Sequence, residues 1–231
     1  MILMPYRILF VAATQVEAET IAGVPESKAI QGGYLIGGYE ITVLVAGVGS
    51  ISTAWEMLNW FSVNGRPDLA INAGIAGSYK EEIKIGDVVM PVTDCFADAG
   101  IEDGNNFLTL AEAGLLRANE FPFREGLIHA EPVYAGQLQG IVKTVNAITV
   151  NTATGSDKTR DRLVKKFNPD IETMEGATFF YICRREKIPF IALRAISNIV
   201  ENRNKSNWDL DLALLNLAEK LNEVFLTMVK R

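Results

Sequence analysis

Short apolar runs that suit buried strands alternate with helical segments along the chain, and this alternation limits the possible folds more than any other feature. Buried strands are predicted at "RILFVAAT" (residues 7–14), "DLAIN" (68–72), "NAITV" (146–150) and "IPFIALRAISNIV" (188–200). Amphipathic helices are predicted between them, and a longer one at residues 210–231. We therefore expect a single α/β domain over residues 1–231, in which helices cover a mixed or mostly parallel sheet.

Unusual residues follow several of these strands. In α/β sheets, ligands bind beyond the carboxyl ends of the strands, so residues that follow different strands are expected to meet. Here these are Glu17, the segments 47–50 and 73–78, the pair Met174 and Glu175, and the pair Ser197 and Asn198. The sequence thus predicts a site with two carboxylates, two glycine-rich loops, a side-chain amide and the nearby Arg194.

Glu175 begins a helix predicted from about Met174 to Glu186, on the stripe that carries Phe179. The helix dipole favours an ionised carboxylate there, and a carboxylate accepts two hydrogen bonds at once, as a ribose diol requires. Met174 offers an apolar surface to the sugar. Two plainer interpretations remain open: Glu175 caps its own helix, or it pairs with Arg194.

Glu17 and Asn198 also allow two interpretations each. Glu17 lies where a general base could reach the same pocket, but it also fits a solvated acid in the helical run "VEAE". Asn198 ends a buried strand, and its amide suits the edge of a 6-oxopurine, although "SN" before a loop is also a common turn or cap. Gly74 and Gly77 would let the backbone approach a flat ligand closely.

Composition excludes several other functions. The net charge of −6 argues against a nucleic-acid surface, and no apolar run reaches membrane-spanning length. The two cysteines, Cys95 and Cys183, have no nearby partner ligands, so we expect no metal, and free thiols fit a cytoplasmic protein. The single histidine, His129, fits a surface or strand residue better than a catalytic base. We expect no cofactor, and the start of the chain is predicted to be a strand rather than a signal peptide.

Five segments together resemble the purine nucleoside phosphorylase and nucleosidase superfamily: "VAGVGS", "NAGIAGS", "KIGDVVMP", "TMEGA" and "RAISN". The resemblance runs from about residue 7 to the C-terminus. It implies a three-layer α/β/α sandwich around a twisted mixed sheet, a small-molecule purine nucleoside as the substrate, and a homodimer.

Within that superfamily, residues 96–107 and 194–208 resemble the futalosine hydrolase branch, which releases hypoxanthine from futalosine in an alternative route to menaquinone. The resemblance implies that Glu17 activates water and that Asn198 stabilises the leaving base. It assigns the ribose to Met174 and Glu175, the loop beside base and ribose to Ala76 and Gly77, and a base-stacking position to Thr159. Adenine-specific relatives often carry a serine in that loop where this chain has Ile75, so Ser78 is the remaining hydroxyl there.

The carboxylate on the 5′ side of futalosine is assigned to Arg203, Lys205 or Arg124. Three other functions also remain open for the same fold. The methylthioadenosine/adenosylhomocysteine nucleosidase branch, which usually has an aspartate in place of Asn198, is one rival. A phosphorylase is another, although the charge of Glu17 would repel phosphate. A nucleoside-binding protein without activity is the third.

Overall fold

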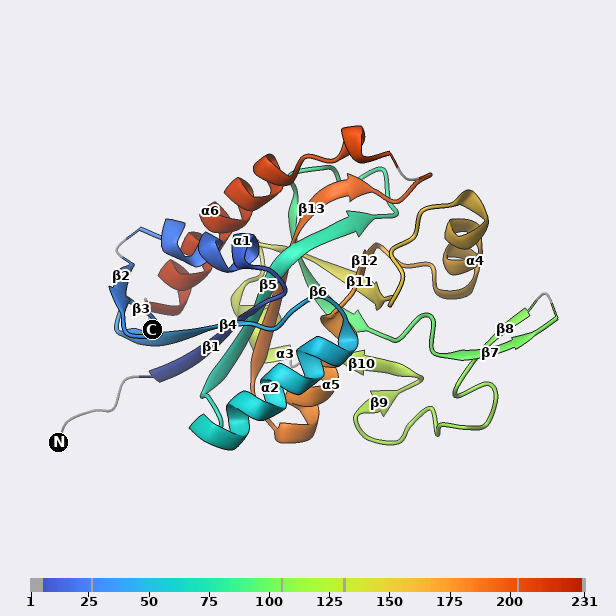
Figure 1. Ribbon diagram of the computed structural model, residues 1–231, viewed down its shortest axis with the longest axis horizontal. Coiled ribbons are helices and arrows are strands. Elements are labelled where there is room, and N and C mark those ends of the chain that lie inside the picture. The colour runs from blue at the N-terminus through green and yellow to red at the C-terminus, as the bar shows by residue number, and fades with distance from the viewer. Residues whose placement is uncertain (1–5, 26, 105, 131, 203, 230–231) are drawn as a thin grey trace.

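The computed structural model describes residues 6–25, 27–104, 106–130, 132–202 and 204–229 (Figure 1). The helices are α1 (Gln15–Ala18), α2 (Ser50–Asn64), α3 (Pro132–Gln137), α4 (Asp157–Phe167), α5 (Gly176–Glu186) and α6 (Leu210–Val229), with short 3-10 helices at Glu19–Gly23 (η1) and Lys205–Asn207 (η2). The first strands are β1 (Tyr6–Ala12), β2 (Lys28–Ile30), β3 (Gly33–Ile36), β4 (Tyr39–Val45), β5 (Leu69–Ser78) and β6 (Val88–Asp94). They are followed by β7 (Gly100–Asp103), β8 (Asn106–Thr109), β9 (Phe123–Arg124), β10 (Leu127–His129), β11 (Lys143–Thr149), β12 (Ile171–Thr173) and β13 (Phe190–Ile199).

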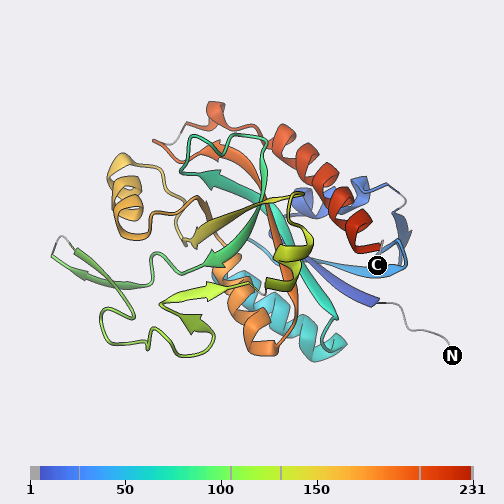
Figure 2. The same ribbon diagram turned by 180° about the vertical axis from the view of Figure 1, so that it is seen from behind.

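Eleven of the described strands form one mixed sheet, in the order β2-β3-β4-β1-β5-β12-β11-β6-β10-β9, with β13 pairing with both β5 and β6. β13 runs parallel to β5 from Phe190 to Ile199, with a bulge between Ile196 and Asn198. β7 and β8 form a separate hairpin, which projects from the body in both views (Figures 1 and 2).

Helices cover both faces of the sheet, so the predicted three-layer α/β/α architecture is confirmed (Figures 1 and 2). On one face α6 packs with η1 through buried residues that include Ile21, Leu217 and Phe225. On the other face α2 and α5 lie side by side and bury Met57, Phe179 and Phe180. Burial of these apolar side chains on both faces is the main force that stabilises the sandwich.

Three predicted boundaries were wrong in ways that bear on the site. β1 ends at Ala12, two residues before the predicted end. Residues 73–78 are not a loop, because β5 continues unbroken from Leu69 to Ser78 along β13. α5 begins at Gly176, after β12 has ended at Thr173, so Met174 and Glu175 lie in the turn between strand and helix.

Candidate active site

The candidate site lies where β5 exchanges one neighbouring strand for another. β1 pairs with β5 from Leu69 to Asn72, and β12 pairs with it only from Gly77 to Ser78. Along that edge, the residues of β5 in between are left without a strand partner. At Ile75 the carboxylate of Glu17 takes the place of a strand partner, because its Oε1 accepts a hydrogen bond from the backbone N–H of Ile75 at 3.0 Å.

Glu17 is held rigidly in this gap. Thr14 and Glu17 form a capping box at the start of α1, in which Glu17 Oε2 accepts from the backbone N–H of Thr14 at 2.9 Å and from its hydroxyl at 2.7 Å. The residue is 7% exposed, so it is not the solvated acid of a helical run, whereas its neighbour Glu19 is exposed. A Cβ added at Gly74 would lie 2.5 Å from Glu17 Oε1. Gly74 therefore makes room for this carboxylate.

Glu175 occupies the N-cap position of α5 but makes no capping hydrogen bond with its side chain. Its Oε1 instead accepts from the backbone N–H of Gly49, at the start of α2, at 2.8 Å. Burial raises the pKa of Glu175, which the N–H of Gly49 and the charge of Arg194 oppose, while Glu17 adds to the rise. The helix dipole alone predicts the opposite direction, because it favours the ionised form. The helix-cap interpretation is thus excluded, and the carboxylate faces the site.

Arg194 on β13 supplies positive charge beneath these carboxylates. Its side chain is 2% exposed and donates to the backbone oxygen of Asn72 at 3.0 Å, to that of Leu193 at 2.9 Å and to the side-chain oxygen of Asn72. No hydrogen bond or ion pair joins Arg194 to Glu175 within the described contacts, so the alternative of a direct pair is not formed. Burial lowers the pKa of Arg194, and the charges of Glu175, Glu17 and a third acid, Asp94, oppose this effect.

Asp94 belongs to this group of charges but was not predicted from the sequence. It ends β6 with its side chain fully buried, and burial raises its pKa to about 7 despite the opposing effects of Thr149 and Arg194. A polar residue at the end of a buried strand was the signal that identified Glu17 and Asn198, and the same signal is present at Asp94.

Asn198 lies at the same edge, across from Gly77 on β5. Its Oδ1 accepts from the hydroxyl of Ser197 at 2.9 Å, and its Nδ2 donates to the backbone oxygen of Ile199 at 3.1 Å. A Cβ at Gly77 would lie 3.2 Å from this Nδ2 and 2.8 Å from a methyl group of Val200, so the glycine makes room for these side chains. The amide is only partly buried, and one of its two N–H groups has no partner within the described residues.

The other predicted residues fall into two groups. Ala76 is buried in β5, and Met174 is partly buried beside Glu175. Thr159 lies in the first turn of α4, where its backbone N–H donates to Ser156 Oγ at 3.3 Å. It lines a separate cavity of about 330 Å³ that also contains Asp98, Thr154 and Arg162, and no described contact links it to the carboxylates.

Arg124 on β9 donates to Nδ1 of His129 at 2.8 Å, and burial lowers the pKa of that histidine. Arg203 lies outside the described residues, as does the side chain of Lys205. Cys95 and Cys183 are free and buried. Within the described part of the chain there is no group of three or more His, Cys, Asp or Glu residues that could hold a metal ion. Nor does any described helix have the length and apolar character needed to cross a membrane.

Three comparisons with known proteins bear on this site. The family model described as "Phosphorylase superfamily" matches residues 1–230. Futalosine hydrolase of Streptomyces coelicolor is 29% identical over 189 residues, which cover 79% of this chain and 77% of that protein. A 5′-methylthioadenosine/S-adenosylhomocysteine nucleosidase of Bacillus cereus is 27% identical over 216 residues, which cover 91% and 89%.

The fold is also that of a solved structure. Futalosine hydrolase of Helicobacter pylori superimposes with a TM-score of 0.79 over 97% of this chain and 99% of that chain, at 17% sequence identity. Relatives of the two kinds therefore resemble the chain to a similar degree, and the identity of the substrate has to be argued from the site.

Proposed function

Because the chain belongs to the phosphorylase superfamily, we propose that it hydrolyses the N-ribosidic bond of a 6-oxopurine nucleoside, with futalosine as the substrate that fits best. At the coarser level it is a nucleosidase of this superfamily. The observation that carries the finer proposal is Asn198, whose Oδ1 is occupied by Ser197 and whose Nδ2 retains one N–H for a ligand. O6 and N7 of a 6-oxopurine are both acceptors, so a donor at this position stabilises the charge on the departing base.

The ribose is assigned to Glu175 and Met174. Glu175 has one oxygen bound to Gly49, which leaves acceptor capacity on both oxygens for a pair of hydroxyls. As the bond to the base breaks, positive charge develops on the sugar, and the negative cluster of Glu175, Glu17 and Asp94 stabilises it. The partial burial of Glu175 strengthens this interaction relative to the same contact in water.

Glu17 is assigned the role of general base. Its two oxygens accept three hydrogen bonds from protein groups, which orient the carboxylate and leave one acceptor position for water. In the proposed reaction the bond between the ribose carbon and the base nitrogen breaks, and its electron pair leaves with the base. The water oxygen bonds to the ribose carbon, and the water proton passes to Glu17. A fixed negative charge here also disfavours phosphate as the nucleophile.

The test is base release in phosphate-free buffer, measured by chromatography for futalosine, inosine and methylthioadenosine in parallel. Hypoxanthine from futalosine alone is the expected result, and it would assign specificity to the 5′ group. Adenine from methylthioadenosine would move the chain to the other nucleosidases and overturn the role of Asn198. Cleavage that requires added phosphate would indicate a phosphorylase, and no cleavage of any substrate would indicate a binding protein.

The Glu175→Gln variant is expected to raise KM and to lower kcat, with a loss in kcat/KM of about 10–100-fold. The amide replaces one acceptor oxygen by a donor that faces the ribose hydroxyls, and the negative charge near the sugar is lost. Steady-state kinetics with futalosine and with a 2′-deoxyribose analogue measure both effects. If Glu175 binds the diol, the preference of the wild type for the ribose form shrinks in the variant. Unchanged kinetics would remove Glu175 from the site.

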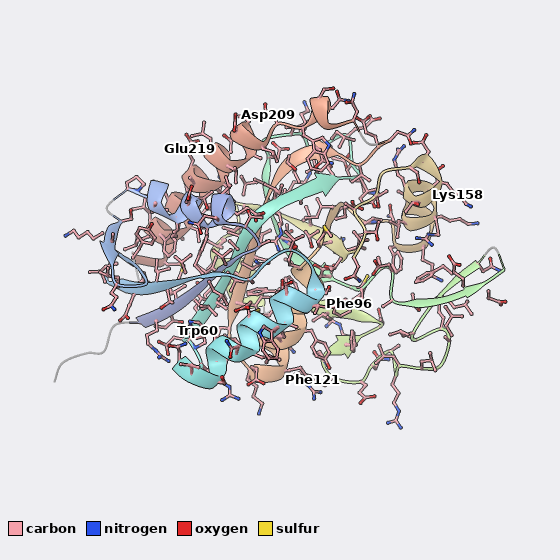
Figure 3. All side chains as sticks on the ribbon, in the orientation of Figure 1. Trp60, Phe96, Phe121, Lys158, Asp209 and Glu219 are labelled. Atoms are coloured by element: carbon pink, nitrogen blue, oxygen red, sulfur yellow. The ribbon has the colours of Figure 1, made fainter. Side chains whose placement is uncertain are left out.

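A homodimer is proposed through the exposed face of α2. Ile51 is 85% exposed, Trp55 69% and Leu58 48%, and these positions lie on one face of the helix. Trp60 and Phe61 are instead partly buried against the core beneath α2 and α5, and Figure 3 marks Trp60 on this helix. An exposed apolar stripe of this kind is typical of an interface between protein chains.

The Trp55→Glu variant is therefore expected to shift the protein from dimer to monomer in sedimentation or light scattering, at micromolar concentration. The buried charge would cost several kcal/mol at the centre of an apolar interface. Val63→Glu is a matched control, since this exposed residue lies at the far end of the helix near Gly65. A wild-type protein that is monomeric would contradict the proposal outright.

A further inference from the structure

Asp94 is a fully buried carboxyl group to which the proposed reaction assigns no contact with substrate. Its Oδ1 accepts from the backbone N–H of Cys95 at 2.8 Å and from the hydroxyl of Thr149 at 3.0 Å. Its Oδ2 is buried without a hydrogen-bond partner in the described part of the chain. Burying a carboxyl oxygen in this way is costly, so its retention needs a reason.

The surroundings of Asp94 connect it to the turn that holds Glu175. A Cβ added at Gly176, the first residue of α5, would lie 2.2 Å from Asp94 Oδ2, so this oxygen lies directly under the start of the helix. Thr149 donates its hydroxyl to Asp94 and accepts from the backbone N–H of Ala177 at 2.7 Å. The hydroxyl of Thr173 accepts from the N–H of Gly176 at 3.1 Å. The hydroxyls of Thr149 and Thr173 thus hold the first turn of α5, and the hydroxyl of Thr149 is itself bound to Asp94.

The same carboxyl group belongs to the charge cluster of the site. Asp94, Glu17 and Glu175 share one buried cation, Arg194, whose own hydrogen bonds go to Asn72 and Leu193. The remaining titratable groups around Asp94 are Cys95 beside it and His129 on β10, and the latter is engaged with Arg124. Cys183 on α5 is a buried thiol with a raised pKa. Arg194 and Glu17 are therefore the charges that act on Glu175, and Glu175 adds to the rise that burial causes in the pKa of Asp94.

We propose that Asp94 is a positioning residue for Glu175: through Thr149 it fixes the first turn of α5, and with that turn the place of the Glu175 carboxylate. This inference rests on the proposed nucleosidase function, but one of its consequences can be measured without substrate. The N–H of Gly49 lowers the pKa of Glu175, so a carboxylate displaced from that N–H is expected to titrate at higher pH.

The first experiment compares kcat/KM for the wild type, Asp94→Ala and Asp94→Asn. Asp94→Ala removes the oxygen that accepts from Thr149 and is expected to lower kcat/KM about tenfold, whereas Asp94→Asn keeps such an oxygen and is expected to retain most of the activity. Asp170→Ala is the matched control, because Asp170 binds a backbone N–H, that of Asn146, at 2.8 Å and makes no described contact with the cluster. Wild-type kinetics in Asp94→Ala, or an Asp94→Asn variant as impaired as Asp94→Ala, would overturn the proposal.

A second variant tests the anchoring role separately. Thr149→Val retains the charge of Asp94 and removes the hydroxyl that links it to α5. It is expected to lower kcat/KM about tenfold through misplacement of Glu175. Wild-type kinetics in Thr149→Val would overturn the anchoring role. This variant also keeps the proposal testable if Asp94→Ala does not fold.

A carboxyl ¹³C NMR titration separates failure of this inference from failure of the proposed function. The Glu175 resonance is identified by its absence in Glu175→Gln, and its pKa is expected to rise in Thr149→Val, through loss of the Gly49 N–H, even if no substrate is cleaved. An unchanged Glu175 pKa would refute the inference. A shifted pKa in a protein that releases no base would refute the proposed function alone.

Discussion

Glu17→Gln is expected to lower kcat by about 10²–10⁴-fold while KM changes little, because a general base acts on the water and not on the bound nucleoside. The glutamine oxygen can still accept from the N–H of Ile75, so the side chain retains its place at the gap between β1 and β12. The amide nitrogen would replace Oε2, which accepts from both donors of Thr14. We therefore also expect a loss of about 1 kcal/mol in the free energy of unfolding.

The matched control is Glu19→Gln, two residues along the chain. Glu19 is exposed and accepts one hydrogen bond from Gln15 Nε2 at 3.2 Å, so its replacement should leave both kcat and stability close to those of the wild type. The comparison requires thermal denaturation alongside the kinetics, since a fall in kcat must exceed what a loss of folded protein explains. A Glu17→Gln enzyme with wild-type turnover would mean that another group activates the water.

The sequence predicted the general place of the site because that place follows from strand ends. Glu17, Glu175 and Asn198 each follow or end a buried strand, and the convergence of strand ends in an α/β sheet brought them to one edge. The alternation of strands and helices predicted that helices would cover the sheet. Both inferences depend on periodicity and on polar residues next to apolar runs, which a single sequence contains.

What the sequence did not predict depends on contacts between distant segments. The glycines at 74 and 77 suggested a loop, since glycine weakens strands, but pairing with β13 along its whole length keeps β5 extended. The space at Gly74 is needed by Glu17, which lies 57 residues earlier in the chain. Asp94 became visible as a member of the site only when β6, α5 and β13 were brought together around Arg194. The direction of the pKa of Glu175 likewise depends on burial, which the helix position alone does not reveal.

Asn198→Asp is expected to reverse the preference between 6-oxopurine and 6-aminopurine nucleosides. A carboxylate at this position would meet O6 and N7 of the 6-oxopurine with two acceptors and no donor. The mismatch of a partly buried polar contact costs about 2–3 kcal/mol, which corresponds to a loss of roughly 30–150-fold in kcat/KM for futalosine. For a 6-aminopurine, the carboxylate can instead accept a proton held at N7 and a hydrogen from the amino group, so weak cleavage of methylthioadenosine should appear.

The structure constrains how this substitution must be interpreted. The hydroxyl of Ser197 donates to Oδ1 of Asn198 and can donate equally to an aspartate oxygen, so one side of the new carboxylate remains oriented. The other oxygen would lose the hydrogen bond to the backbone oxygen of Ile199, and two acceptors would then face each other. Some loss of activity on every substrate is therefore expected from this local repulsion. The decisive quantity is the ratio of kcat/KM for futalosine to that for methylthioadenosine, because the repulsion affects both substrates equally. A ratio that is unchanged in Asn198→Asp would show that the base is recognised elsewhere, whereas a fall of tenfold or more would assign that recognition to the amide of Asn198.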